Sequence, residues 1–167
     1  MPLIVEPFMH ELEQEAQTTR RLLERVPNDK LTWKPHEKSM SLGELAQHVA
    51  TIPGMLASTF VDDTFDFSNL GHSAKLNSAA ELPGMLKDSV ATARRIIGSF
   101  DDKKALGNWK ATMGSKDLMV MPRVAAIRYM VLNHWFHHRG QLSVYLRLLN
   151  VPVPSIYGPS ADENPWA

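Results

Sequence analysis

Four stretches of the chain place apolar residues at the spacing of an amphipathic α-helix. They cover residues 4 to 25, residues 42 to 60, a third segment that ends at residue 97, and residues 124 to 149. In each stretch apolar side chains recur three or four positions apart, so that they fall on one face of a helix. Each such face needs a partner to bury it, and four of them predict an all-α protein, a four-helix bundle.

Capping signals mark where two of these helices begin. Ser41 followed three residues later by Glu44 is a capping box, in which each side chain bonds the backbone N–H of the other residue. The same serine–glutamate pattern recurs at Ser78, but the proline at position 83 would remove a hydrogen bond from a helix that started there. The sequence therefore leaves the start of the third helix open between residues 79 and 85.

The segments outside these helices differ in character. Residues 61 to 77 carry several aspartates and two phenylalanines and predict a solvated loop. Residues 99 to 121 are the least helical part and predict a small hairpin or a short extended crossover before the last helix. After Asn150 the chain is rich in proline, which predicts an irregular C-terminal tail packed on the bundle.

Composition narrows the class of protein. The length of 167 residues fits a single domain spanning 1–167. Eighteen basic residues balance eighteen acidic ones, so no net charge favours nucleic acid or an anionic membrane as a partner. No apolar stretch is long enough to span a bilayer, and the first residues lack the features of a signal peptide. There is no cysteine, which excludes disulfides, thiolate metal ligands and a cysteine nucleophile. We expect a cytoplasmic protein.

Three histidines form the candidate metal site. His134 and His138 are four residues apart on the predicted last helix and share one face, which is directed toward the core. His48 lies between apolar neighbours of the second helix and is expected to face the core as well. One such histidine is more often a core residue paired with backbone or a carboxylate. Three unpaired buried imidazoles would be costly, whereas one zinc, nickel or iron ion would satisfy all of them.

The other four histidines are not expected to be ligands. We expect His10 to be solvated or otherwise satisfied, and His36 and His72 to be exposed. His137 is offset by about 100° from its neighbour His138 around the helix, so it belongs beside the site or on the surface.

Several segments distributed along the chain resemble the DinB family, bacterial DNA-damage-inducible-like proteins of the DinB/YfiT-like metalloenzyme superfamily. They are Thr19-Arg20-Arg21-Leu22-Leu23, Trp33-Lys34-Pro35, the run from Ser41 to Val49, His138-Arg139-Gly140-Gln141-Leu142, and the run from Tyr157 to Glu163. The resemblance implies a four-helix bundle, often dimeric, that binds nickel, zinc or iron through His48, His134 and His138. It does not fix an activity, because the relatives include S-transferases that use low-molecular-weight thiols, maleylpyruvate isomerase-like proteins and hydrolases.

Two kinds of chemistry remain open at such a site. Three neutral ligands leave a divalent ion with an open coordination position, the arrangement typical of catalytic sites. That position could hold a water whose pKa is lowered, for hydrolysis, or a thiol held as thiolate, for S-transfer to a small-molecule substrate. Candidates for a general base are Glu44, one turn before His48, and Asp162 or Glu163 if the tail folds over the site. The alternative is a non-catalytic, stress-related metal-binding or interaction module.

Overall fold

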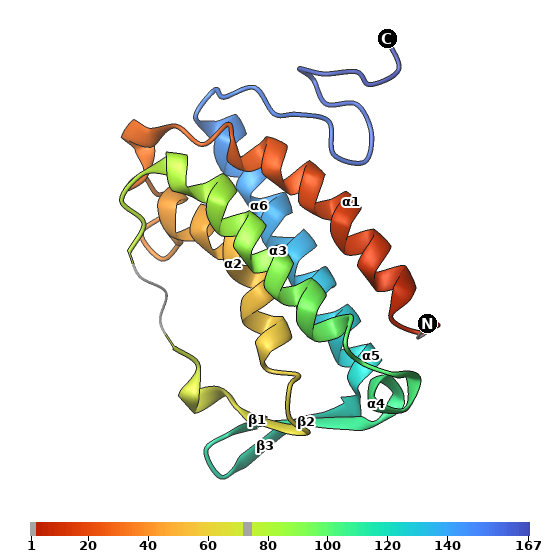
Figure 1. Ribbon diagram of the computed structural model, residues 1–167. Coiled ribbons are helices and arrows are strands. Elements are labelled where there is room, and N and C mark those ends of the chain that lie inside the picture. The colour runs from red at the N-terminus through yellow and green to blue at the C-terminus, as the bar shows by residue number, and fades with distance from the viewer. Residues whose placement is uncertain (1–2, 72–74) are drawn as a thin grey trace.

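The computed structural model describes residues 3–71 and 75–167, and within them long helices form a bundle (Figure 1). The bundle consists of α1 (Glu6–Leu23), α2 (Leu42–Ser58), α3 (Leu82–Ile97) and a continuous last helix. The last helix joins α5 (Arg123–Ala126), a π-helical segment η4 (Ile127–Asn133) and α6 (His134–Leu148). Helix α4 (Asp102–Leu106) is short, and single 3-10 turns occupy Asn28–Lys30, Phe67–Asn69 and Ala79–Glu81. The four predicted helices are therefore confirmed.

Both capping signals are used, in different ways. The Ser41 hydroxyl accepts the Glu44 N–H at 3.2 Å and the Glu44 carboxylate accepts the Ser41 N–H at 2.7 Å, which closes the box at the start of α2. The box at Ser78 caps the 3-10 turn, and α3 begins only at Leu82 with a proline in its first turn. A proline is tolerated there because the first N–H groups of a helix have no intrahelical partner.

The expectation of a purely all-α fold needs a correction, because a small sheet closes one end of the bundle (Figure 1). Strands β2 (Asn108–Met113) and β3 (Lys116–Pro122) form the predicted hairpin before the last helix. Strand β1 (Thr64–Asp66) pairs parallel with β2, although it lies in a stretch predicted to be a solvated loop. The sequence of β1 does not by itself predict a strand, because the strand forms by pairing with residues more than 40 positions away. The fold is mostly helical with a three-stranded sheet.

A buried arginine explains why the chain between α2 and β1 is held in place. Arg123 is 1% exposed, and its guanidinium donates to the backbone oxygens of Phe60, Asp62 and Lys104 at 2.9 to 3.2 Å. It also bonds the Asp63 carboxylate at 2.6 Å. Arg123 therefore joins the start of the last helix to the segment that leads into β1 and to α4.

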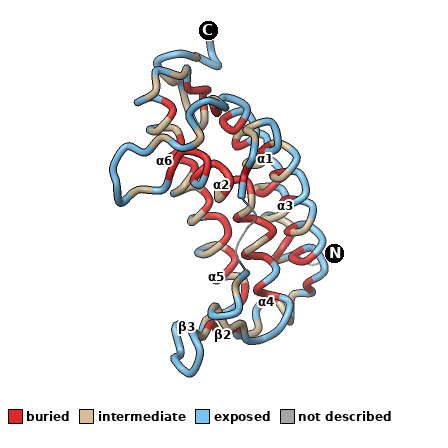
Figure 2. Tube along the Cα trace, turned by 90° about the vertical axis from the view of Figure 1, so that its left-hand side faces the viewer, coloured by how far each residue is buried: buried red, intermediate tan, exposed pale blue. Residues whose placement is uncertain are grey.

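The C-terminal tail is irregular and packs on the bundle, as expected. Val153, Pro154 and Ser155 are buried, and the tail lies at the opposite end of the bundle from the sheet (Figure 1). Buried positions otherwise gather on the inward faces of the helices, while the tip of the β2–β3 hairpin is exposed (Figure 2). Across residues 3–71 and 75–167, no helix combines the length and the apolarity that crossing a bilayer would require.

Candidate metal centre

The three predicted ligands meet between α2 and α6. His48 projects from α2 and His134 and His138 from α6, and a ring nitrogen from each lies within 4.8 Å of one from every other. The ring centroids are separated by 4.6 Å for both pairs that include His138 and by 5.4 Å for His48 and His134. The sequence predicts that these side chains face the core. In the structure all three are half-buried, so they lie at the edge of the core and not in its centre. A site at the edge is open to solvent on one side.

The spacing of the nitrogens fits a tetrahedral ion. Nε2 of His48 and Nε2 of His134 are 3.2 Å apart. Two nitrogens at 2.0–2.1 Å from a tetrahedral zinc ion would be about 3.3 Å apart. The third candidate ligand, His138, has a ring nitrogen within 4.8 Å of a nitrogen of each of the other two.

The protonation of the three histidines also suits a metal ligand. Burial and, to a smaller extent, the neighbouring His138 and His134 together lower the pKa of His48 to about 4. Burial is likewise the main cause that lowers the pKa of His134 and of His138. All three imidazoles are therefore neutral at pH 7, the form in which a ring nitrogen offers its lone pair.

Gln141 fixes the orientation of one candidate ligand, His138. Nδ1 of His138 lies 2.8 Å from Oε1 of Gln141, one turn further along α6. With the amide oxygen as acceptor, Nδ1 carries the proton and Nε2 keeps its lone pair for an ion. Sequence reasoning did not identify this role for Gln141, although a glutamine three residues after a helical ligand is the signal that would have found it.

Trp135 holds α6 against α2 beside the histidines. Its side chain is fully buried, and its indole N–H donates to the backbone oxygen of Val49 at 2.8 Å. Since Trp135 follows His134 and Val49 follows His48, this bond fixes the two helices at the height of the site.

A π-helical segment, Ile127–Asn133, ends directly before His134. Sequence analysis had assumed regular helical spacing through this region. Ile127 and Val131 are buried, but the wider turns of this segment change the angular relation between them and the histidines. Single π-turns of this kind occur frequently at functional sites.

The histidines that were not expected to be ligands lie outside the cluster where the structure describes them. His10, His36 and His137 are exposed. The His137 ring is 4.8 Å from that of His138, beside the site but not part of it. His72 lies outside the described residues.

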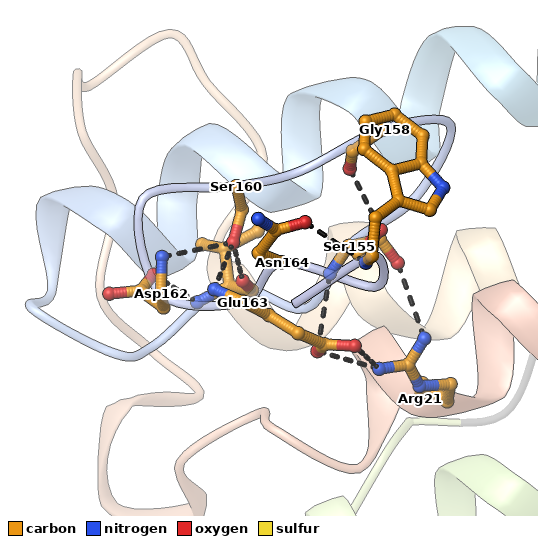
Figure 3. A network of polar contacts seen from close by, with 9 residues as sticks. Arg21, Ser155, Gly158, Ser160, Asp162, Glu163 and Asn164 are labelled. Atoms are coloured by element: carbon orange, nitrogen blue, oxygen red, sulfur yellow. Dashed lines mark hydrogen bonds and ion pairs between the residues drawn. The ribbon is translucent and has the colours of Figure 1, made fainter.

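The three candidate bases have structural partners. Glu44 is held in the capping box, and the Ser41 backbone N–H is the main cause that lowers the pKa of its carboxylate. Asp162 pairs with Arg147 and accepts the Val153 N–H at 2.8 Å, while Glu163 pairs with Arg21 at 2.5 and 2.6 Å (Figure 3). The cluster found in the described part of the chain contains histidines and no carboxylate. A role for these residues as general base stays a prediction.

The family model described as "DinB family" matches residues 1–165. The chain belongs to the DinB family. The family resemblance seen in the sequence is thereby confirmed.

This DinB protein has relatives at the level of sequence and at the level of fold. The uncharacterized protein YrdA of Bacillus subtilis strain 168 is 26% identical over 160 residues, which cover 96% of this chain and 90% of YrdA. A DinB-like protein of B. subtilis, YjoA, is 21% identical with a TM-score of 0.69, over 88% of this chain and 96% of that one. A DinB-like protein of Bacillus cereus ATCC 10987 is also 21% identical with a TM-score of 0.69, over 92% and 97% of the two chains. At this identity the solved structures show a shared fold and not a shared activity.

Proposed function

We propose that this DinB protein is a metal-dependent enzyme that acts on a small molecule. His48, His134 and His138 hold one divalent ion of zinc, nickel or iron. The observation that carries this proposal is the convergence of three neutral imidazoles from two helices, with ring nitrogens within 4.8 Å of one another. The cluster contains no carboxylate that would reduce the positive charge of the ion, so the ion keeps its full Lewis acidity.

The residues of the chain determine what such a site can do. When bound, the ion supplies a Lewis acid that favours the deprotonated form of water or of a thiol. The half-buried position leaves one side of the cluster accessible to a small substrate. Since the chain has no cysteine, the thiol for an S-transfer reaction must come from a low-molecular-weight cosubstrate. Hydrolysis of a small ester or amide is the second reaction of the same site.

The alternative is a non-catalytic, stress-related metal-binding or interaction module. The two proposals are separated by turnover of a low-molecular-weight thiol with an electrophile, and of activated esters, by protein loaded with zinc or nickel. We expect turnover by the loaded wild type and none by His48→Ala protein. Equal background rates for the two proteins, at verified metal content of the wild type, would favour the non-catalytic module.

Metal affinity should depend on pH in the range set by the lowered histidine pKa values. Protons compete with an ion only as the pH falls toward the pKa of the folded protein, which is about 4 for His48 and below 6.5 for His134 and His138. We therefore expect nearly constant zinc affinity from about pH 8 to 6.5 and a steep loss between 6.5 and 4. Competition with a chelator of known affinity at each pH measures this, with His137→Ala protein as the control. A loss already complete at pH 6.5 would contradict a half-buried site.

We also propose that residues 1–167 act as one domain that forms a homodimer. A single buried cluster joins all the long helices, which supports one domain. Tyr129, Val144 and Leu148 of the last helix are more than half exposed, which supports a second copy packed on this helix. Sedimentation should then give twice the chain mass of 18.8 kDa. A monomer at micromolar concentration would exclude a stable dimer.

A further inference from the structure

A buried arginine lies directly behind the candidate metal centre. Arg139 follows His138 in α6, but its side chain is directed toward α1 and the C-terminal tail and is 2% exposed. Its guanidinium pairs with the Glu15 carboxylate at 2.5 Å and donates to the Thr19 hydroxyl at 3.1 Å. It also donates to the Tyr157 hydroxyl, which in turn donates to the Glu15 carboxylate at 3.0 Å. One side chain of α6 is thus bonded to both α1 and the tail.

Two aromatic rings enclose the same guanidinium. Its carbon lies 5.1 Å from the ring centroids of Phe136 and of Tyr157, and the two rings contact each other edge to face at 6.3 Å. A planar guanidinium between aromatic faces and a carboxylate has little freedom to move, because it is weakly hydrated and its bonding geometry is fixed. These contacts hold α6 in one orientation about its own axis.

The orientation of α6 decides where its histidines point. Phe136 and Arg139 are three residues apart on the side of the helix that meets α1 and the tail, whereas His134 and His138 are four apart on the side that meets His48. A rotation of the helix by about 10° would move an atom about 6 Å from the axis by about 1 Å. Metal–ligand distances tolerate only about 0.2 Å, so a site on two helices depends on such a constraint.

We propose that Arg139, Glu15 and Tyr157 are positioning residues for the metal centre. They hold α6 at the rotation in which His134 and His138 converge on His48. Through Tyr157, the C-terminal tail therefore helps to orient the metal-binding histidines. This inference rests on the proposed function, because it requires that the three histidines bind an ion.

The chain offers a matched control in Arg123. It is as deeply buried as Arg139 and belongs to the same continuous helix, but it bonds Asp63 and backbone oxygens at the end that carries the sheet. It lies 16 residues before Arg139, about 24 Å along a helix. Lysine at either position keeps the charge and loses the planar set of donors. Arg123→Lys therefore reports the general cost of disturbing a buried arginine.

The experiment measures Co²⁺ affinity by chelator competition, together with the visible absorption of bound Co²⁺, whose bands report ligand geometry. Wild type, Arg139→Lys, Tyr157→Phe and Arg123→Lys are compared at a temperature at which circular dichroism shows each to be folded. We expect Arg139→Lys and Tyr157→Phe to raise the Kd about tenfold or more and to change the absorption bands. Arg123→Lys protein should have the same Kd and the same absorption bands as wild type, even though its melting temperature is lower.

Each other outcome overturns the inference. If Arg139→Lys and Tyr157→Phe bind Co²⁺ as wild type does, while His48→Ala does not, the positioning role is wrong and the proposed site stands. If Arg123→Lys weakens binding as much as Arg139→Lys, the effect is one of general stability. If wild type does not bind Co²⁺, or His48→Ala binds it as tightly, the proposed function itself fails. Should Arg139→Lys not fold, Tyr157→Phe decides, because it removes one hydroxyl and keeps the ring.

Discussion

Replacing any one of His48, His134 and His138 with alanine should empty the site, whereas His137→Ala should keep it. A site with three protein ligands cannot lose one without losing most of its affinity. Loss of an outer partner of a ligand already costs 10- to 100-fold, so loss of a ligand should raise the Kd for zinc by more than about 100-fold. Metal content after dialysis and a chelator titration of each variant measure the effect.

His137→Ala is the internal control for this series. The ring of His137 is exposed and lies 4.8 Å from that of His138, so its removal changes the local charge but no ligand. We expect less than about a tenfold change in Kd for this variant. If His137→Ala empties the site while His138→Ala leaves it filled, the assignment of ligands on α6 is wrong.

Removal of the metal should lower the melting temperature of the wild-type protein substantially. An ion that binds only the folded state adds RT ln(1 + [L]/Kd) to stability, about 2.7 kcal/mol at one hundred times the Kd. For a chain of this size that corresponds to roughly 5 to 10 °C. Calorimetry or circular dichroism with and without a strong chelator, followed by re-addition of zinc, measures the shift.

His48→Ala protein is the control for chelation. It should melt at the same temperature with and without chelator, since it has no complete site to lose. An equal shift in both proteins would mean that the chelator or another ion acts elsewhere on the chain. A wild-type melting curve that does not move after verified metal removal would contradict a site between α2 and α6.

The parts of the fold that could be predicted from the sequence are those with local signals. Helical spacing identified the four long helices, and the Ser41–Glu44 pattern identified the cap of α2, because both depend on residues within one or two turns. The three histidines could be grouped because each occupied a position that the helical pattern directs inward. Their positions on neighbouring helices then followed from the bundle.

The parts that could not be predicted depend on contacts between distant residues. Strand β1 exists because it pairs with β2 and because Arg123 holds the preceding segment, and neither partner is near it in sequence. The π-helical segment before His134 has no local signature in an apolar pattern that fits a regular helix equally well. The partners of Arg139 come from α1 and from the tail, 120 residues before it and 18 after it.

The contacts of the two candidate bases in the tail also could not be predicted from the sequence. Asp162 and Glu163 are candidate bases only if the tail, which is predicted to pack on the bundle, folds over the site. In the structure Arg147 pairs with Asp162, and the Ser160 hydroxyl donates to the Val153 backbone oxygen at 2.6 Å. Arg21 pairs with Glu163, whose backbone lies beside Ser160 (Figure 3). The Arg21–Glu163 pair joins residues 142 positions apart, and the Arg147–Asp162 pair joins the last helix to an irregular segment 15 residues later, so neither can be read from local sequence.

The most direct test of the account is the position of the ion in a crystal of the zinc-loaded protein. Diffraction data collected on both sides of the zinc absorption edge locate the metal without reference to the protein atoms. The account predicts one anomalous peak per chain, about 2.0–2.1 Å from a ring nitrogen of each of His48, His134 and His138. A peak at other residues, such as the aspartates between 62 and 66, or a filled site that one of the three histidines does not contact, would contradict it.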